Sequence, residues 1–312
     1  MDKKEKNFLS AVIYVHNAEA QIEKFLRMVK EVLEENFEHS EIICVNDDSR
    51  DRSVSVIRNV SAEAVTSSIS ILNMSYFHGL EMAMNAGVDL AIGDFVLEFD
   101  LPVSDFDRAE IMNVYYRALR GFDIVSASPE RKEKLSSTFF YKVFDRFSEM
   151  TGKMSTERFR ILSRRVINRI SSMNKTVPYR KVVYAACGLK TDHIKYHAAG
   201  NMENHYDRKE KNYRFGLAVD TLILFTEMGY WFSLSMTLFM MLMSVIMIAY
   251  SVTVYIASHP VAGWTTTVLF LSVAFFGLFG ILTIVIKYLQ LLVDLVFKRK
   301  HYSFESIEKL TK

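Results

Sequence analysis

Four aspartates are the first candidates for functional residues in this sequence. Asp47, Asp48 and Asp51 crowd one short segment, and Asp100 follows a separate apolar run. Carboxylates gathered in one place repel each other, and proteins commonly relieve the repulsion with a divalent cation, with basic partners or with donors on a ligand. A helix that follows an acidic turn also brings backbone N–H groups that favour a phosphate-bearing ligand. The pattern is typical of a nucleotide-dependent transfer.

A purely structural role fits the same spacing. Asp47 and Ser49 could cap the helix that we expect next, and Asp51 could stabilise its first turn. The residue pattern leaves both interpretations open.

Apolar runs and amphipathic segments alternate over the first 126 residues. This alternation predicts strands and helices, and it places the acids relative to the predicted strands. We expect strands at 8–15, 41–45, 68–73, 95–99 and 122–126, and helices over 17–36 and 79–91 and from residues 51 and 107. Such alternation predicts an α/β fold with a mostly parallel sheet and right-handed crossovers. Ligands of these sheets bind beyond the carboxyl ends of the strands, where this chain has Asn17, Glu19, the segment 46–51 and Asp100.

One long segment contains no charge. Residues 231–286 are 56 consecutive positions without Asp, Glu, Lys or Arg, and Pro260 and Gly263 interrupt them. Because about 20 helical residues cross a bilayer core, we predict two transmembrane helices at 231–257 and 265–286. A pair of core helices in a soluble protein is the competing interpretation.

Basic residues predict the orientation of these helices. The loop between them has no Lys or Arg, whereas 298–300 is Lys-Arg-Lys, and such residues favour the cytoplasmic side. We therefore predict a multi-pass protein of the cell membrane with its α/β domain and both termini in the cytoplasm. The expected parts are the α/β domain (1–212), a juxtamembrane segment (213–230), the two transmembrane helices (231–286) and a basic tail (287–312).

Composition excludes several classes of protein. The 312 residues are 50% hydrophobic and 24% charged, which excludes a disordered or collagen-like chain, and two cysteines do not suggest a disulfide framework. With 38 Lys and Arg against 36 Asp and Glu, the net charge of +2 argues against nucleic acid as a partner. Residues 1–6 have no signal-peptide pattern, so we expect the α/β domain to stay in a reducing compartment.

Several segments carry a resemblance by their order. They are Val12-Ile13-Tyr14-Val15-His16-Asn17-Ala18-Glu19, Val45-Asn46-Asp47-Asp48-Ser49-Arg50-Asp51-Arg52-Ser53, Gly79-Leu80-Glu81-Met82-Ala83-Met84-Asn85-Ala86-Gly87 and Ala91-Ile92-Gly93-Asp94. Together they resemble family 2 glycosyltransferases of the GT-A fold. The segment 158–165, the two predicted spans and the segment 287–302 look like the branch that makes polyprenyl-phosphate-linked sugars.

The resemblance implies a reaction and a set of site residues. A sugar would move from a nucleotide sugar to polyprenyl (undecaprenyl) phosphate, for cell-surface glycan synthesis. The implied nucleotide-sugar-binding residues are Val15, Asn17, Glu19, Asp47, Asp48 and Gly79, and the implied catalytic residues are Asp100, Glu157 and Arg160.

The resemblance also implies partners for these residues. Arg160 and Arg164 would bind the acceptor phosphate, since a guanidinium suits phosphate oxygens. Mg²⁺ or Mn²⁺ on Asp100 would stabilise the leaving diphosphate. Relatives with such an anchor often form oligomers, and the apolar spans are compatible with a homo-oligomer.

The chain departs from the family pattern at the metal motif. Pro102 stands at the second acid of Asp-x-Asp, and Arg158 stands where the polyprenyl branch often has Asp. Asp48 or the segment Asp105-Phe106-Asp107 could supply the missing ligand, although the latter also matches the start of a helix.

His193 and His197 offer a different metal site. Their i, i+4 spacing would allow both to bind zinc if the segment were a helix, with His205 as a third candidate ligand. A solvated loop is the competing interpretation.

Three functions are compatible with the sequence. The first is a membrane-anchored glycosyltransferase that uses polyprenyl phosphate. The alternative is a catalytically degenerate relative that binds nucleotide sugar or a partner enzyme as a membrane scaffold, which the departures at Pro102 and Arg158 favour. A channel or transporter is the weakest, because the predicted spans contain no charged residue.

Overall fold

The computed structural model describes residues 4–130, 157–172, 179–198, 208–225 and 304–309, together with separate positions between 235 and 292. Two compact units make up the chain. The first comprises Met1–Lys142, Met150–Leu217 and Arg299–Lys312, and the second comprises Val143–Glu149 and Ala218–Lys298. Every described strand belongs to the first unit.

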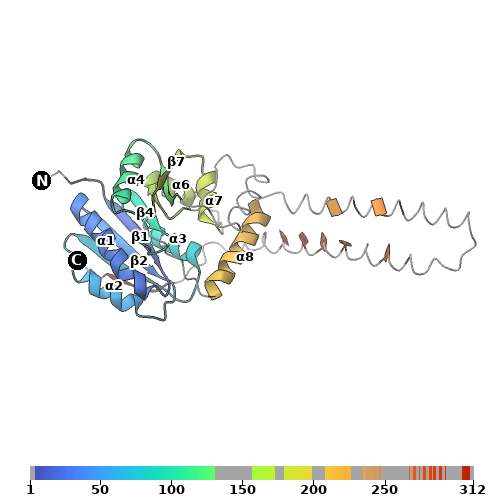
Figure 1. The fold of residues 1–312 in the computed structure, drawn as a ribbon, viewed down its shortest axis with the longest axis horizontal. Coiled ribbons are helices and arrows are strands. Elements are labelled where there is room, and N and C mark those ends of the chain that lie inside the picture. Colours follow the sequence, from blue (N-terminus) through green and yellow to red (C-terminus); the bar gives the residue numbers. More distant parts are fainter. Residues whose placement is uncertain are drawn as a thin grey trace, which may run out of the picture. The chain divides into compact units, whose positions relative to one another are not determined.

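Strands and helices alternate along the first unit (Figure 1). The strands are β1 (Leu9–Val15), β2 (Ser40–Asn46), β3 (Ser67–Met74), β4 (Phe95–Phe99), β5 (Ile124–Pro129), β6 (Phe159–Ser163), β7 (Thr191–Tyr196) and β8 (Phe304–Lys309). The helices are α1 (Glu19–Asn36), α2 (Ser53–Ser61), α3 (Leu80–Leu90), α4 (Ala109–Leu119), α6 (Arg164–Ser172), α7 (Arg180–Ala186) and α8 (Arg208–Phe225), whose last residues belong to the second unit.

The strands form one sheet in the order β7-β5-β6-β4-β1-β2-β3-β8. Its centre, β4-β1-β2-β3, is parallel, and Val15 of β1 pairs with Asn46 of β2 while Ile13 pairs with Phe99 of β4. The carboxyl ends of these strands therefore lie at one edge. β6 is antiparallel to both β4 and β5, and β8 is antiparallel to β3.

Burial explains why β1 is a central strand. All seven of its residues are buried, and their side chains alternate between two apolar clusters. Leu9, Ala11, Ile13 and Val15 pack with residues of α1, α2 and α4, whereas Val12 and Tyr14 pack with residues of α3, α6 and α7. Helices thus cover both faces of the sheet, and each large apolar side chain that is fully buried contributes about 1.5–3 kcal/mol.

A glycine allows α3 to approach the sheet closely. A Cβ atom on Gly87 would lie 2.4 Å from Cγ1 of Val12 and 2.6 Å from Cγ2 of Val45. These distances are too short for real side chains, so the packing of α3 on β1 and β2 requires glycine at this position.

The expected elements up to residue 119 are confirmed, with ends that shift by one or two residues. The α/β architecture with a mostly parallel sheet is also confirmed. Residues 159–163, 191–196 and 304–309 are also strands, which their sequence pattern did not predict. The last of these puts part of the predicted basic tail into the sheet of the first unit, beside β3.

The predicted transmembrane helices at 231–257 and 265–286 lie almost entirely outside the described residues, so they stay predictions. Within the described part of the chain, no helix is both long and apolar enough to cross a membrane.

Candidate functional site

Two loops meet at the carboxyl edge of the sheet. Asn17 and Asp48 each have a positive φ, 47° and 55°, which Asn and Asp tolerate better than most residues. The backbone N–H of Arg50 donates to Oδ1 of Asn17 over 2.8 Å, and that of Asn17 donates to Oγ of Ser49 over 3.1 Å. The loop after β1 is thus fastened to the loop after β2.

A second pair of contacts links the beginnings of α1 and α2. The N–H of Glu19 donates to Oδ2 of Asp51, and the N–H of Arg52 donates to Oε2 of Glu19, each over 2.9 Å. Burial raises the pKa of Asp51, but donors that include the hydroxyl and N–H of Ser53 outweigh it, and the pKa lies below its ordinary value. Asp51 lies two residues before α2, so it contacts the first residue of that helix from outside its first turn.

Asp47 has a different environment. Its carboxylate is fully buried and accepts the N–H groups of His78 and Gly79, each over 2.8 Å, and the hydroxyl of Tyr14 over 3.0 Å. Burial is the main cause that raises the pKa of Asp47 above its ordinary value. Asp47 therefore binds the turn before α3 and does not cap α2.

Gly79 shapes this turn. Its φ of 82° favours glycine, and a Cβ atom there would lie 2.3 Å from Cζ of Tyr213 on α8. The predicted residue Val15 contacts Asp47 only through its backbone. Its side chain lies in the core, and its carbonyl accepts the N–H of Asp47 over 2.9 Å. Asp48 is partly exposed and forms an ion pair of 3.8 Å with Arg50.

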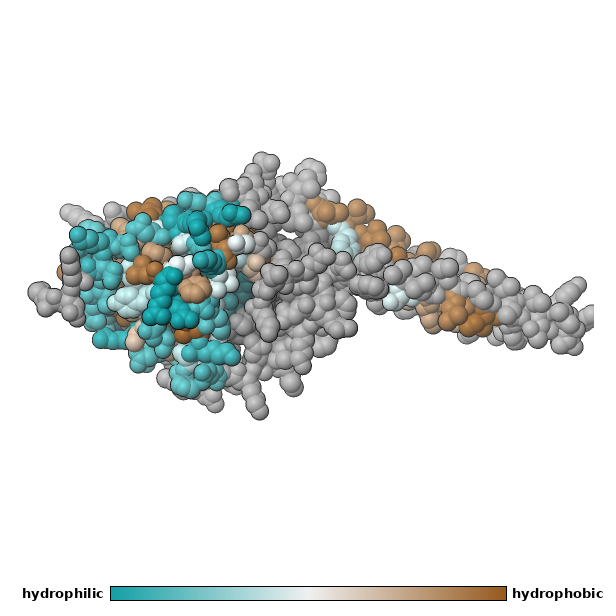
Figure 2. Space-filling model, turned by 90° about the horizontal axis from the view of Figure 1, so that it is seen from above, coloured by the Kyte–Doolittle hydropathy of each residue, from teal (hydrophilic) through white to brown (hydrophobic). Residues whose placement is uncertain are grey.

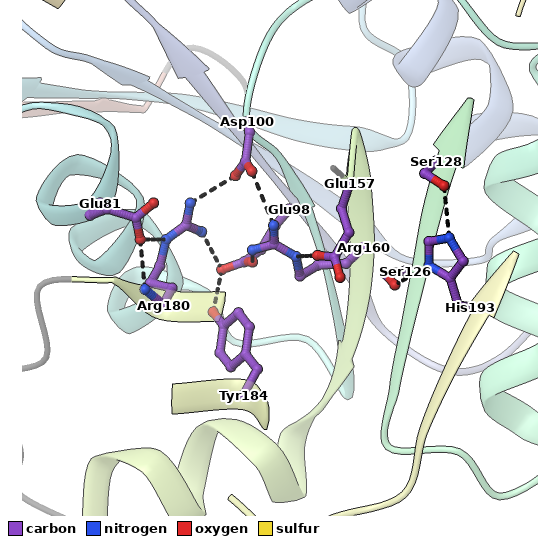
Figure 3. Close-up of polar contacts among 10 residues, drawn as sticks. All are labelled: Glu81, Glu98, Asp100, Ser126, Ser128, Glu157, Arg160, Arg180, Tyr184 and His193. Atoms are coloured by element: carbon purple, nitrogen blue, oxygen red, sulfur yellow. Dashed lines mark hydrogen bonds and ion pairs between the residues drawn. The ribbon is translucent and has the colours of Figure 1, made fainter. Parts of the chain in front are cut away.

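Next to these loops, Asp100 follows β4 and lies between two arginines (Figure 3). Its Oδ1 accepts Nη2 of Arg180 over 2.7 Å, and its Oδ2 accepts Nη2 of Arg160 over 3.0 Å. Burial favours the neutral acid, but the two guanidinium charges lower the pKa of Asp100 well below its ordinary value. Asp100 is therefore an ionised carboxylate with both oxygens bound.

Glu98 accepts hydrogen bonds from the same two arginines as Asp100. Its Oε1 accepts Nη1 of Arg180 over 2.8 Å and the hydroxyl of Tyr184 over 2.7 Å, and its Oε2 accepts Nη1 of Arg160 over 2.8 Å. The register of β4 and β6 pairs Glu98 directly with Arg160. Arg180 and Tyr184 lie one turn apart on α7, so both reach Glu98.

Two outer carboxylates complete this group, which we call the ionic cluster: Glu81, Glu98, Asp100, Glu157, Arg160 and Arg180. Oε2 of Glu81 accepts the backbone N–H and Nε of Arg180, and Oε2 of Glu157 accepts Nε of Arg160 over 3.0 Å. Each guanidinium thus donates from all three of its nitrogens to carboxylates. The predicted residues Asp100, Glu157 and Arg160 are brought together, whereas Arg180 and Glu98 were not anticipated.

This donor set does not fit the Mg²⁺ or Mn²⁺ that the resemblance implies. A hard cation needs several free oxygen ligands, but both oxygens of Asp100 accept from guanidinium groups and the side chain of Pro102 has no ligand atom. Among the residues that the structure describes, no group of three or more His, Cys, Asp or Glu could hold a metal ion.

Asp105 is not free to supply the missing ligand. It is fully buried and accepts Nε of Arg158 at both oxygens, over 3.2 and 3.0 Å, as well as the hydroxyl of Tyr196 over 3.2 Å. Oδ1 of Asp107 accepts the N–H of Ala109 at the beginning of α4. The interpretation of this segment as a helix start is the one that the structure supports.

Arg164 lies away from the other predicted phosphate ligand. Its guanidinium donates to the backbone carbonyls of Ala91 and Gly93, before β4 begins. Arg160 instead pairs with Glu98 near the end of β4, four residues and roughly 13 Å away along β6. The structure therefore does not bring Arg160 and Arg164 together, because the extended backbone of β6 places them at opposite edges of the sheet.

The helix that a zinc site on His193 and His197 would require is not present, because residues 191–196 form strand β7 and His197 directly follows it. The ring of His193 lies between the hydroxyls of Ser126 and Ser128, at 2.9 and 2.7 Å, as Figure 3 shows. Burial lowers the pKa of His193 below its ordinary value. His197 pairs with Glu130.

Similarity to known proteins identifies the family of this chain. The family described as "Glycosyl transferase family 2" matches residues 10–166. An uncharacterized glycosyltransferase of Synechocystis is 30% identical over 188 residues, which are 58% of this chain and 58% of that protein. A prophage bactoprenol glucosyl transferase homolog of Escherichia coli is 29% identical over 195 residues, 60% of this chain and 62% of that protein.

The chain thus matches about three fifths of the length of these relatives. Among solved structures, glucosyl-3-phosphoglycerate synthase of Mycobacterium tuberculosis, in complex with Mn²⁺, uridine diphosphate and phosphoglyceric acid, has a TM-score of 0.46 and 12% identity, covering 70% of this chain and 76% of that one. The family match includes the loops after β1, β2 and β4 and reaches Arg160, and it covers half of the chain. This chain belongs to glycosyl transferase family 2.

Proposed function

We propose that the chain is a membrane-anchored glycosyltransferase that moves a sugar from a nucleotide sugar to polyprenyl phosphate, for cell-surface glycan synthesis. The observation that carries the proposal is the family 2 match, together with the similarity to a protein named as a bactoprenol glucosyl transferase homolog over 195 residues. The loops after β1 and β2, which Asn17, Glu19 and Asp51 hold together, are where the nucleotide would bind.

The proposed reaction is a simple displacement. An oxygen of the lipid phosphate attacks the anomeric carbon of the sugar and forms the new C–O bond. The bond from that carbon to the β-phosphate oxygen breaks, and the nucleoside diphosphate leaves with the electron pair. The attacking phosphate is already ionised near neutral pH, so the step requires no side chain to remove a proton.

Membrane anchoring is supported by the exposed side chains of the second unit. Phe239, Leu242 and Ile246 are exposed at spacings of three and four, and so are Leu278, Leu282, Val285, Leu289 and Leu292. Apolar rows of this period, all but Leu289 and Leu292 within the uncharged segment 231–286, suit helices whose sides face lipid or another copy of the chain. In Figure 2 the coloured residues of the second unit are mostly brown, whereas those of the first unit are mostly teal.

The position of β8 supports the proposed topology. The chain leaves the first unit after Leu217 and rejoins it at Arg299, so that β8 pairs with β3. A segment that begins and ends in one folded unit crosses a bilayer an even number of times. Two spans with the α/β domain and both termini at the cytoplasmic face satisfy this condition.

The test is a transfer assay on membranes that contain the full chain. Labelled nucleotide sugars and undecaprenyl phosphate should yield labelled lipid, and the label should vanish when the acceptor is omitted or when membranes lack the chain. Absence of labelled lipid with every donor, in the presence and in the absence of divalent cations, would contradict the proposal.

A non-catalytic function is the second candidate, and a specific observation favours it. Arg158 stands in place of an acid and is bound to the buried Asp105, while Asp100 is enclosed by arginines. A scaffold that binds nucleotide sugar or a partner enzyme needs no free acid at these positions. Calorimetry that detects nucleotide binding together with an inactive transfer assay would select this function.

A further inference from the structure

In the ionic cluster, Arg160 and Arg180 bind the oxygens of Asp100, the residue on which a family 2 enzyme is expected to bind its cation. Each carboxylate oxygen of Asp100 accepts a different guanidinium, from Arg180 over 2.7 Å and from Arg160 over 3.0 Å. A cation bound to the same oxygens would lie against two positive charges, in a region with little water to screen them.

Moving either arginine away from Asp100 would destabilise the fold. Arg160 and Arg180 also neutralise Glu98, whose side chain is fully buried between them. Moving either guanidinium would leave a buried carboxylate without one of its partners, which is strongly destabilising. Arg180 is further held by Glu81 through both its backbone N–H and its Nε.

The remaining acids do not assemble a second site around the arginine pair. The cluster has four carboxylates and two guanidinium groups, so two negative charges are in excess. This excess does not form a cation site, because the acids that carry it are not next to each other. The outer acids Glu81 and Glu157 bind different arginines and lie on opposite sides of the pair in Figure 3. Asp105, the nearest acid along the chain after Asp100, is bound by Arg158.

We propose that this chain binds its nucleotide sugar without a divalent cation on Asp100, and that Arg160 and Arg180 hold Asp100 as a positioning residue in place of a metal ligand. The proposal rests on the proposed function in one respect, namely that a nucleotide sugar is the ligand. It implies that an aspartate at the position of the family's metal motif is retained here for its ion pairs.

The test measures cation binding directly and does not depend on activity. The full chain is titrated with Mn²⁺, and the free ion is followed by its electron paramagnetic resonance signal, with and without uridine diphosphate. Asp100→Asn is compared with Asp89→Asn, a matched change at an exposed position near the end of α3. We expect the same amount of bound Mn²⁺ in the wild type and in both variants.

Calorimetry supplies a second measurement on the wild type, so the proposal stays testable if a variant does not fold. Uridine diphosphate should bind with an affinity that changes by less than about twofold between EDTA and saturating Mn²⁺. Bound Mn²⁺ that is lost only in Asp100→Asn, or an affinity at least about tenfold higher with Mn²⁺, would overturn the proposal. If no nucleotide binds, the proposed function loses its support, whereas the Mn²⁺ titration of the free chain still decides the occupancy of Asp100.

Discussion

Asp100 and Arg180 are joined by a hydrogen bond of 2.7 Å between Oδ1 and Nη2, although 80 positions separate them along the chain. The contact fixes the first residue of α7 to the end of β4. Because Arg180 also binds Glu81 and Glu98, one side chain connects α3, β4 and α7. The orientation of α7 over the sheet therefore depends on a charge–charge contact as well as on apolar packing.

Arg180→Met should destabilise the first unit strongly. The variant keeps the apolar part of the side chain but leaves Glu81, Glu98 and Asp100 with a lost partner in a buried region, and we expect a loss of ~3–5 kcal/mol in the free energy of unfolding. Urea unfolding of the full chain measures it. Arg52→Met is the matched control, because that side chain is 84% exposed, and its effect should stay within ~0.5 kcal/mol. Equal losses in the two variants would contradict the prediction.

Asp100→Asn should change the pH dependence of stability. The pKa of Asp100 in the fold is below the ordinary value of 3.8, because the arginine charges outweigh burial, so the ionised form stabilises the fold. This contribution is complete above 3.8 and is lost as the pH falls through the lower folded pKa. The difference in unfolding free energy between wild type and Asp100→Asn should therefore shrink as the pH is lowered below 3.8.

Asp47→Asn is the companion variant, with the opposite sign. Burial raises the pKa of Asp47 above 3.8, so the folded state holds its proton more tightly than the unfolded state does. The wild type should lose stability relative to Asp47→Asn as the pH rises from 3.8 through that raised pKa. Urea unfolding over a pH series measures both variants, and slopes of the same sign in the two would refute this account of the two carboxylates.

Arg158→Asp introduces an acid at the position where the resemblance to the polyprenyl branch implies one, and we expect it to destabilise this chain. The new carboxylate would face Asp105, which is fully buried, and the loss should exceed ~3 kcal/mol. Adding Asp105→Asn should recover part of the loss, because it removes the repulsion. Arg108→Asp, at an exposed ion pair with Glu35, serves as the control and should cost under ~1 kcal/mol. Failure of the second substitution to recover any stability would argue against a direct pair.

Gly87→Ala and Gly216→Ala form a matched pair of helical substitutions. The added methyl group on Gly87 would meet Val12 and Val45 at 2.4 and 2.6 Å, so crowding should cost ~1–3 kcal/mol. The same group on Gly216 meets nothing within 4 Å, and the better helix propensity of alanine should leave stability equal or higher by up to ~1 kcal/mol. Thermal unfolding checks both, and a larger loss at Gly216 would contradict the packing argument.

The sequence by itself determined the central α/β arrangement. The buried run of β1, the apolar spacing of Ile22, Phe25 and Leu26 on α1, and the acids after β2 are local patterns, and local patterns show period and ends directly. They correctly placed Asn17, Glu19, Asp47 and Asp100 at one edge of the sheet. A role for Asp51 at the beginning of the helix after β2 was also among the expected alternatives.

Only the tertiary structure decided which side chains meet Asp100. Arg180 and Glu98 come from distant segments, and no spacing in the sequence marks a contact between residues 82 positions apart. The strands β6, β7 and β8 likewise depend on pairing with neighbours far away along the chain, which competes with local preference and has no local signature. Long-range charge pairing in a buried site therefore determined whether the acid after β4 is a metal ligand or the partner of two arginines.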